Sequence, residues 1–318
     1  MAYKKIFAPE AVERAAAPEA AAGSLGDQGG GSVYVYTERI VLAVNVALAT
    51  GRPLLVRGPS GSGKSSLARN VAHVLKHRYY ETVISSRTQA RDLLWEVDLL
   101  RRLNDAQSLK DAFDADLSRY VMPGPLWWAF DRESALRHST AAAEPGPEQK
   151  YPDAPAVVLL DEIDKADPDV PNNLLVPLGS LRFLVEETGE QVRATPGKAP
   201  LVFITTNDER ELPTAFLRRC VEIILPAAPD ERLMQIGKAH FPHFDDRLLK
   251  AVARHSGRVS GAAGPAGDGR PSPAEYLDTL RVCDRLGIEP GSEDWENVVQ
   301  MTLWKHGRRP GEEDESDE

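Results

Sequence analysis

The most informative segment of the sequence is a run rich in glycine and serine, Gly58-Pro59-Ser60-Gly61-Ser62-Gly63-Lys64-Ser65-Ser66. It follows the pattern of glycine, any four residues, glycine, lysine and serine or threonine, which is typical of loops that wrap nucleotide phosphates. Such loops present several backbone N–H groups, and glycines leave the approach unobstructed. Lys64 is expected to reach the β and γ phosphates, and Ser65 to ligate Mg²⁺ at the start of a helix whose dipole favours anions. The whole run is therefore predicted to bind the nucleotide.

The residues on both sides of this loop fit the same interpretation. Residues 53–57 are a short apolar run of the kind that forms a buried strand. Residues 66–75 place four apolar side chains on one helical face, namely Leu67, Val71, Val74 and Leu75. A loop that matched the pattern by accident would lack this flanking strand and helix. The sequence thus indicates a P-loop nucleotide-binding fold of the α/β class.

A second run, Val157-Val158-Leu159-Leu160, is predicted to form a buried parallel strand with acids at its C-terminal end. Asp161 and Glu162 follow it directly, and open α/β sheets carry their chemistry at that end. Asp161 is expected to hold the Mg²⁺ ion, and Glu162 to polarise the water that attacks the γ-phosphate. The alternative is a core strand followed by a solvated acidic turn. The phosphate loop in the same chain favours the functional interpretation.

The residues after this strand favour ATP over GTP. Asp164-Lys165-Ala166-Asp167 resembles the guanine-reading pattern of GTPases, but it has no leading asparagine and follows the strand too closely. The expected cofactors are therefore ATP and Mg²⁺.

Further candidate residues for catalysis follow a third apolar strand, residues 201–206. Asn207 comes directly after it and is expected beside the γ-phosphate. A short helix over residues 212–220 then contains Arg218 and Arg219 near its end. An arginine directed at the nucleotide of a neighbouring subunit neutralises charge that develops in phosphoryl transfer. Paired arginines that close a helix also complement its dipole, but their place in this ordered series favours the first interpretation.

In this order, the phosphate loop, the acidic strand, the asparagine strand and the arginine pair resemble the AAA+ ATPases, and within them the MoxR-like family. The resemblance rests on residues 58–65, 159–167, 206–213 and 215–219, and it extends over about residues 33–305. It implies a parallel sheet with strand order 5-1-4-3-2 and a C-terminal α-helical lid. It also implies a ring, commonly a hexamer, in which neighbouring subunits share each ATP site.

The resemblance implies roles for individual residues as well. Asn207 is similar to the first sensor of these ATPases, and Arg219 to the arginine finger, with Arg218 as the alternative. The implied partner is a protein client, often co-encoded and carrying a von Willebrand A-type domain.

The family usually has a second sensor, an arginine near the start of a C-terminal helix. Here the matching stretch is Ser272-Pro273-Ala274-Glu275, so alanine stands where arginine is expected. Arg270 and Arg281 are the candidates to replace it.

Changes in composition along the chain predict its organisation. Residues 1–32 are expected to be a flexible leader, 33–226 the nucleotide-binding domain with an insertion at about 87–155, 227–308 the helical lid and 309–318 a disordered acidic tail. Residues 183–192 are typical of a hairpin with Gly189 in its turn. The adjacent Trp127 and Trp128 indicate either core packing or a partner contact.

Composition restricts the alternatives. The 318 residues are 42% hydrophobic, include two cysteines and carry a formal net charge of −10. The chain has no run of about 20 apolar residues, the length that a membrane helix requires, and no signal peptide, so a cytoplasmic protein is expected. The negative charge disfavours general nucleic-acid binding. A nucleic-acid-associated NTPase, such as a nuclease-coupled motor, and a nucleotide-sensing scaffold remain the alternatives to a remodeller of proteins.

Overall fold

The computed structural model describes residues 3–9, 33–109, 116–139, 144–146, 149–258 and 271–303. The acidic tail, Arg270 and most of the predicted leader lie outside these ranges. The described residues fall into two compact units. The sheet unit takes those within Met1–Ala17, Thr37–Arg57 and Ala68–Ile223, and the lid unit takes those within Pro18–Tyr36, Gly58–Leu67 and Ile224–Glu318.

The main sheet has five strands, in the order β2-β5-β8-β1-β9. They are β1 (Leu54–Arg57), β2 (Arg78–Val83), β5 (Ala156–Asp161), β8 (Leu201–Thr206) and β9 (Val221–Ile224). Numbered along the chain, these strands stand in the order 5-1-4-3-2 when the sheet is followed from β9. The predicted α/β topology is therefore confirmed.

The strands that precede the candidate residues are adjacent and parallel. β8 pairs with β5 on one side and with β1 on the other, where Arg57 lies opposite Thr206. All six residues of β8 and the first five of β5 are buried, which explains their mainly apolar sequences. The C-terminal ends of these strands share one edge of the sheet, so Asp161 and Asn207 lie along that edge.

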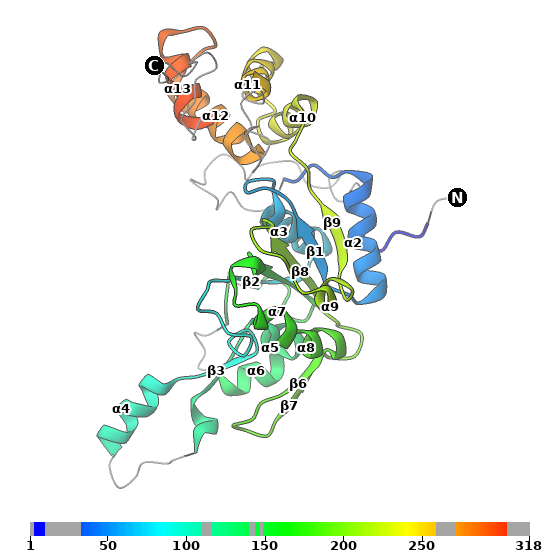
Figure 1. The fold of residues 1–318 in the computed structure, drawn as a ribbon, viewed down its shortest axis with the longest axis vertical. Helices are drawn as coiled ribbons and strands as arrows, with labels where there is room; N and C mark the ends of the chain where they lie inside the picture. Colours follow the sequence, from blue (N-terminus) through cyan, green and yellow to red (C-terminus); the bar gives the residue numbers. More distant parts are fainter. Residues whose placement is uncertain are drawn as a thin grey trace, which may run out of the picture. The chain divides into compact units, whose positions relative to one another are not determined.

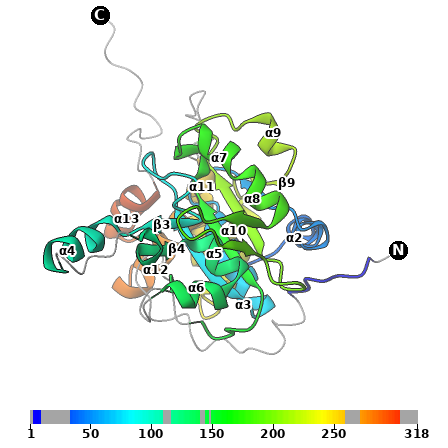
Figure 2. The same ribbon diagram turned by 90° about the horizontal axis from the view of Figure 1, so that it is seen from below.

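Helices precede and follow β1, and the second of them confirms the helix predicted after the phosphate loop. The hydroxyl of Thr37 caps α2 (Glu38–Thr50) by accepting from the Ile40 N–H at 3.3 Å. The helix ends at Gly51, whose φ of 65° suits a left-handed C-cap. α2 lies beside the edge strand β9 in both views (Figure 1, Figure 2). α3 (Lys64–Leu75) begins inside the phosphate loop and buries Leu67 and Val71.

A second, two-stranded antiparallel sheet of β3 (Trp95–Val97) and β4 (Val121–Pro123) lies in the sequence between β2 and β5. The same segment contains α4 (Leu99–Leu109), the 3-10 helix η3 (Leu117–Tyr120), α5 (Pro125–Phe130) and α6 (Arg132–His138). Figure 1 shows α4 extending away from the rest of the sheet unit. The boundaries of the predicted insertion stay a prediction.

Trp127 and Trp128 of α5 are core residues, with exposed fractions of 0% and 1%. The indole N–H of Trp127 donates to the Ser134 hydroxyl at 2.6 Å, and that of Trp128 donates to the Pro123 carbonyl at 3.1 Å. Both polar atoms are thus satisfied within the sheet unit. Core packing, one of the two interpretations of this pair, is confirmed.

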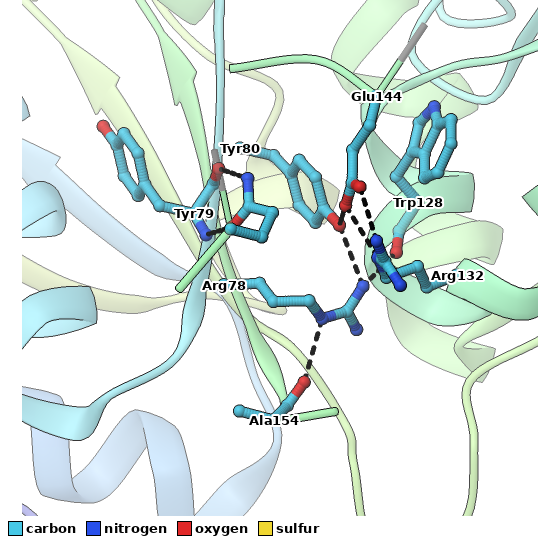
Figure 3. A network of polar contacts seen from close by, with 8 residues as sticks. Arg78, Tyr79, Tyr80, Trp128, Arg132, Glu144 and Ala154 are labelled. Atoms are coloured by element: carbon cyan, nitrogen blue, oxygen red, sulfur yellow. Dashed lines mark hydrogen bonds and ion pairs between the residues drawn. The ribbon is translucent and has the colours of Figure 1, made fainter. Parts of the chain in front are cut away.

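Arg78, the first residue of β2, is buried in a polar network that joins this edge strand to α5 (Figure 3). Its guanidinium donates to the Tyr80 hydroxyl at 2.9 Å, to the Trp128 carbonyl at 2.7 Å and to the Ala154 carbonyl at 2.9 Å. The Tyr80 hydroxyl in turn donates to Glu144 at 2.9 Å. A guanidinium needs such acceptors when it is buried, so the network fixes β2 to the segment that precedes β5.

The remaining elements of the sheet unit come before or after β8 in the sequence, between β5 and β9. They are η4 (Ile163–Lys165), α7 (Asp169–Asn173), α8 (Leu175–Ser180), β6 (Arg182–Leu184), β7 (Gln191–Arg193) and α9 (Thr214–Leu217). β6 and β7 pair as an antiparallel hairpin, and Gly189 in its turn has a φ of 68°. The predicted hairpin is confirmed.

Four helices pack together in the lid unit, as the sequence predicts (Figure 1). They are α10 (Asp230–His240), α11 (Asp246–Arg258), α12 (Pro273–Leu286) and α13 (Glu293–Leu303). Their core includes Leu233, Val252, Tyr276 and Trp295, each at most 2% exposed. Ser272 and Glu275 form a reciprocal capping box at the start of α12.

Candidate functional site

The phosphate loop requires glycine at positions 58 and 61. Gly58 has a φ of 149° and Gly61 a φ of 72°, both in the region that side chains disfavour. A Cβ atom at Gly58 would lie 2.3 Å from the Leu225 carbonyl oxygen, and one at Gly61 would lie 2.4 Å from the Ser272 hydroxyl. A side chain at either position would therefore clash with residues that pack on the loop.

Lys64 and Ser62 fit a loop that holds an anion. Lys64 is only 7% exposed, and its ammonium donates to the carbonyl oxygens of Gly58 and Pro59, both at 2.8 Å. The buried hydroxyl of Ser62 has no hydrogen-bond partner among the described residues. Buried polar atoms of this kind call for a partner, and a phosphate oxygen is the one that the sequence pattern predicts. The loop therefore fits a bound triphosphate.

The other predicted residues of the loop differ in exposure. Ser65 is half-buried at the start of α3, whereas Pro59, Ser60 and Ser66 are exposed. The hydroxyl of Ser65 thus remains the predicted Mg²⁺ ligand from this helix.

The start of α12 packs against the phosphate loop within the lid unit. The Ala274 N–H donates to the Gly61 carbonyl at 3.3 Å. Alanine therefore occupies a place at the loop where the resemblance expects the second-sensor arginine. Arg281, one of the two candidate replacements, lies further along α12 and pairs with Asp278 at 2.7 Å.

Tyr34 also packs on the phosphate loop. Its ring lies 3.5 Å from the position that a Cβ atom of Gly63 would take. Burial raises the pKa of the Tyr34 phenol to about 12, and the charge of Arg232 opposes this shift. Arg232 donates to the carbonyl of Val35. These contacts hold residues 34–35 beside the loop and α10.

Thr205 in β8 connects the two acidic residues at the end of β5. Its hydroxyl donates to the Asp161 carboxylate and accepts from the Glu162 N–H, the second bond at 2.9 Å. The side chain has an exposed fraction of 0%, so packing fixes the direction of its hydroxyl. Thr205 thereby orients both acidic residues from the neighbouring strand, although the sequence did not single it out. A polar residue inside an otherwise apolar strand was the available signal.

The Glu162 carboxylate lies near two nitrogen-bearing side chains. One oxygen is 2.7 Å from the Lys165 ammonium, and the other is 3.5 Å from the Asn207 amide nitrogen. The hydrogen bond with Glu162 raises the pKa of Lys165. Glu162 also has a φ of 61°, which is uncommon for a residue other than glycine. The structure therefore brings together Glu162, which follows β5, and Asn207, which follows β8.

The predicted helix over residues 212–220 is shorter in the structure, because α9 ends at Leu217. Arg218 and Arg219 therefore follow α9 and precede β9. Both side chains are exposed, and one guanidinium nitrogen of Arg219 donates to the Ala215 carbonyl at 3.2 Å. Exposure is what a residue needs if it acts on the site of another subunit. The roles of these two arginines remain predictions.

Thr205→Val should lower the free energy of unfolding by about 1–3 kcal/mol, because valine has a similar shape but leaves the half-buried Glu162 N–H and an Asp161 oxygen without the hydroxyl. Thr205→Ser keeps the hydroxyl and is the matched control. Urea unfolding followed by circular dichroism measures the difference. Equal stability of the two variants would show that the hydroxyl holds neither group.

Two features of other protein classes are missing from the part of the chain that the structure describes. No helix there combines the length and the apolar character needed to cross a membrane. The same residues contain no cluster of three or more His, Cys, Asp or Glu side chains that could hold a metal ion. Mg²⁺ usually takes only one or two protein ligands in phosphate sites, so this result is compatible with a nucleotide-bound ion.

The Thermotoga maritima RuvB Holliday junction branch migration motor shares 16% identity with the chain, covers 84% of it over 67% of its own length, and gives a TM-score of 0.44. A point mutant of the same RuvB shares 14% identity, covers 85% of the chain over 69% of its own length, and gives a TM-score of 0.46. None of the curated proteins matches the chain significantly.

A sequence model of one protein family matches the region that contains the candidate residues. The family is described as the AAA domain of the dynein-related subfamily, and the match covers residues 53–220, more than half of the chain. This region runs from β1 and the phosphate loop through Asp161, Glu162 and Asn207 to the arginine pair. The chain therefore belongs to the AAA domain family, dynein-related subfamily.

Proposed function

We propose that this protein is a MoxR-like AAA+ ATPase that hydrolyses ATP with Mg²⁺ at the subunit interfaces of a ring, and so remodels or activates a protein partner. Membership of the AAA domain family supports ATP binding and hydrolysis in general. The observation that carries the proposal is the 3.5 Å contact of Glu162 with Asn207 at the sheet edge where β5 ends in Asp161. A carboxylate beside an amide, next to a second carboxylate, is suited to holding and activating a water.

Each residue of the site has a separate proposed task. Residues 58–66 bind the phosphates through backbone N–H groups and the Lys64 ammonium. Ser65 and Asp161 hold Mg²⁺, directly or through its water shell. Bound Mg²⁺ neutralises charge on the phosphate oxygens.

The remaining tasks concern the attacking water and the transferred phosphoryl group. Glu162 takes up the proton of the water, and Asn207 orients the water. Arg219, or Arg218 in its place, stabilises charge on the phosphoryl group that a neighbouring subunit holds.

The proposal extends to assembly and partners. A hexameric ring with shared sites is expected, acting in the cytoplasm on a protein client or co-encoded partner, for which a protein with a von Willebrand A-type domain is one candidate. An arginine finger that acts on the nucleotide of another copy requires such an arrangement.

Lys64→Ala should weaken ATP binding about 10- to 100-fold, which corresponds to the loss of a charge-assisted hydrogen bond to phosphate. Isothermal titration calorimetry with and without Mg²⁺ measures the dissociation constant. Lys250→Ala is the matched control, since Lys250 is an exposed lysine of α11, and it should bind like the wild type. Folded wild-type protein that binds no ATP would overturn the proposed function.

The rate of ATP hydrolysis with and without added nucleic acid distinguishes a protein remodeller from a nucleic-acid motor. A motor on DNA or RNA should hydrolyse ATP faster when the nucleic acid is added. The net charge of −10 provides no general attraction to phosphate backbones. We therefore expect the turnover number to be unchanged by either nucleic acid at physiological salt.

A further inference from the structure

The turn after β8, residues 206–209, presents Asn207 to Glu162, and its backbone is held within the sheet unit at several points. The Asp208 N–H donates to the Thr206 hydroxyl at 2.9 Å. Asp208 has a φ of 61°, a left-handed conformation that aspartate adopts more readily than most residues. The turn thus has a defined shape that other groups must support.

Asp164 supports this turn from the segment that follows β5. A single carboxylate oxygen of Asp164 accepts from the Asn207 N–H at 3.1 Å and from the Glu209 N–H at 3.0 Å. Asp164 is only 3% exposed, and its other carboxylate oxygen has no hydrogen-bond partner among the described residues. A buried carboxylate is costly unless its hydrogen bonds repay the loss of hydration. Asp164 is therefore a buried carboxylate whose two hydrogen bonds both come from backbone N–H groups of this turn.

Arg57 supports the turn from the other neighbouring strand. Its guanidinium donates to the Asp208 carboxylate at 2.9 Å and to Glu222 of β9 at 2.7 Å. These hydrogen bonds, led by that to Glu222, raise the pKa of Arg57. The three side chains are about a third exposed or more, so the ion pairs contribute less than the buried bonds of Asp164. Arg57 is a secondary support.

The short segment from Glu162 to Asp164 contacts Asn207 through both of these acidic residues. Glu162 and Asp164 are separated by a single residue, and both reach the turn, Glu162 to the Asn207 side chain and Asp164 to the Asn207 backbone. If the turn moved, the Asn207 amide would lose its position relative to the Glu162 carboxylate. Displacements of about 1 Å of a catalytic group can lower rates by as much as 100-fold.

We propose that Asp164 is a positioning residue for ATP hydrolysis, which fixes the backbone of the 206–209 turn and thereby the place of the Asn207 amide. This inference rests on the proposed function, because it assigns Asp164 an effect on turnover that is exerted only through Asn207. A purely structural aspartate would affect stability without this dependence.

A double-mutant cycle tests the dependence on Asn207. Asp164→Ala should lower the turnover number about 10-fold or more, with the KM for ATP changed less than about threefold, because the phosphate loop is untouched. Asp164→Asn keeps an acceptor oxygen and should recover part of the rate. In the Asn207→Ala background, Asp164→Ala should lower the rate by no more than about a further threefold, since the two residues act as a unit. Full multiplication of the two single effects would overturn the inference.

Controls separate this result from unfolding and from failure of the proposed function. Asp169→Asn changes an exposed acid of α7 and should leave turnover unchanged. If Asp164→Ala does not fold, the same cycle is run with Asp164→Asn. Hydrogen–deuterium exchange of the peptide that contains Asn207 and Glu209 gives a readout without ATP, and it should be faster in both Asp164 variants. Unchanged exchange, or an additive cycle in an active wild type, would overturn the role of Asp164 alone, whereas an inactive wild type would overturn the proposed function as well.

Discussion

Glu162→Gln should lower the turnover number for ATP by about 100-fold or more, the loss expected when a positioned general base is removed. Glutamine has nearly the same shape, so the hydrogen bond that the backbone N–H of Glu162 donates to the Thr205 hydroxyl at 2.9 Å can persist. It lacks the carboxylate that would take up the proton of the attacking water. The dissociation constant for ATP should change little, because the phosphate loop is unaltered.

Phosphate release under saturating ATP measures the turnover number, and calorimetry measures binding. The matched control is Glu296→Gln, which removes the charge of an exposed glutamate of α13 and should hydrolyse ATP like the wild type. Hydrolysis by Glu162→Gln at the rate of this control would remove Glu162 from the mechanism. A bound but unhydrolysed nucleotide would also make this variant suitable for the capture of a protein client.

The central strands could be predicted because their sequences reflect burial on both faces. β5 and β8 have neighbours on each side in the sheet, and their buried residues form continuous apolar runs. The ends of α2 could be predicted because Thr37 and Gly51 act locally, through a hydroxyl cap and a positive φ. In both cases the determining interactions are visible within a short window of sequence.

The edge strand β2 could not be predicted in the same way. It begins with Arg78 and contains Glu81, charges that do not indicate a core strand. Their partners come from other parts of the chain, as the bonds of Arg78 to the carbonyls of Trp128 and Ala154 show (Figure 3). Strands β3 and β4 have only three residues each, too few to establish an alternating pattern.

In the candidate site, too, features set by neighbouring residues could be predicted, and features set by distant contacts could not. Its phosphate loop and acid pair could be predicted from residues that are consecutive in the sequence. The supporting residues Thr205 and Asp164 act on groups about 40 residues away, through pairings that only the folded sheet creates. Threonine in an apolar strand and a second aspartate after the acid pair were weak signals, because neither residue type by itself specifies a partner.

Arg219→Ala should lower the turnover number about 1,000-fold, the smallest effect typical of an arginine finger, while ATP binding and thermal stability stay close to those of the wild type. The side chain is exposed, and its bond at 3.2 Å to the Ala215 carbonyl lies on the helix end itself. Removal of the Arg219 side chain should therefore change the free energy of unfolding little. Arg218→Ala is the matched comparison, since it removes the adjacent exposed arginine, and the variant with the larger loss of turnover identifies the finger.

Mixing Arg219→Ala with Lys64→Ala protein should restore activity, because a subunit with an intact phosphate loop can then meet a neighbour with an intact finger. Random assembly of equal amounts through head-to-tail interfaces gives both groups to about one quarter of the sites, so the mixture should reach at most about a quarter of wild-type turnover if the sites act independently. At an ATP concentration that saturates Arg219→Ala but not Lys64→Ala, each variant alone should show little hydrolysis, and native mass spectrometry should show rings that contain both. Mixed rings without recovered hydrolysis would show that Arg219 does not act across the interface between subunits.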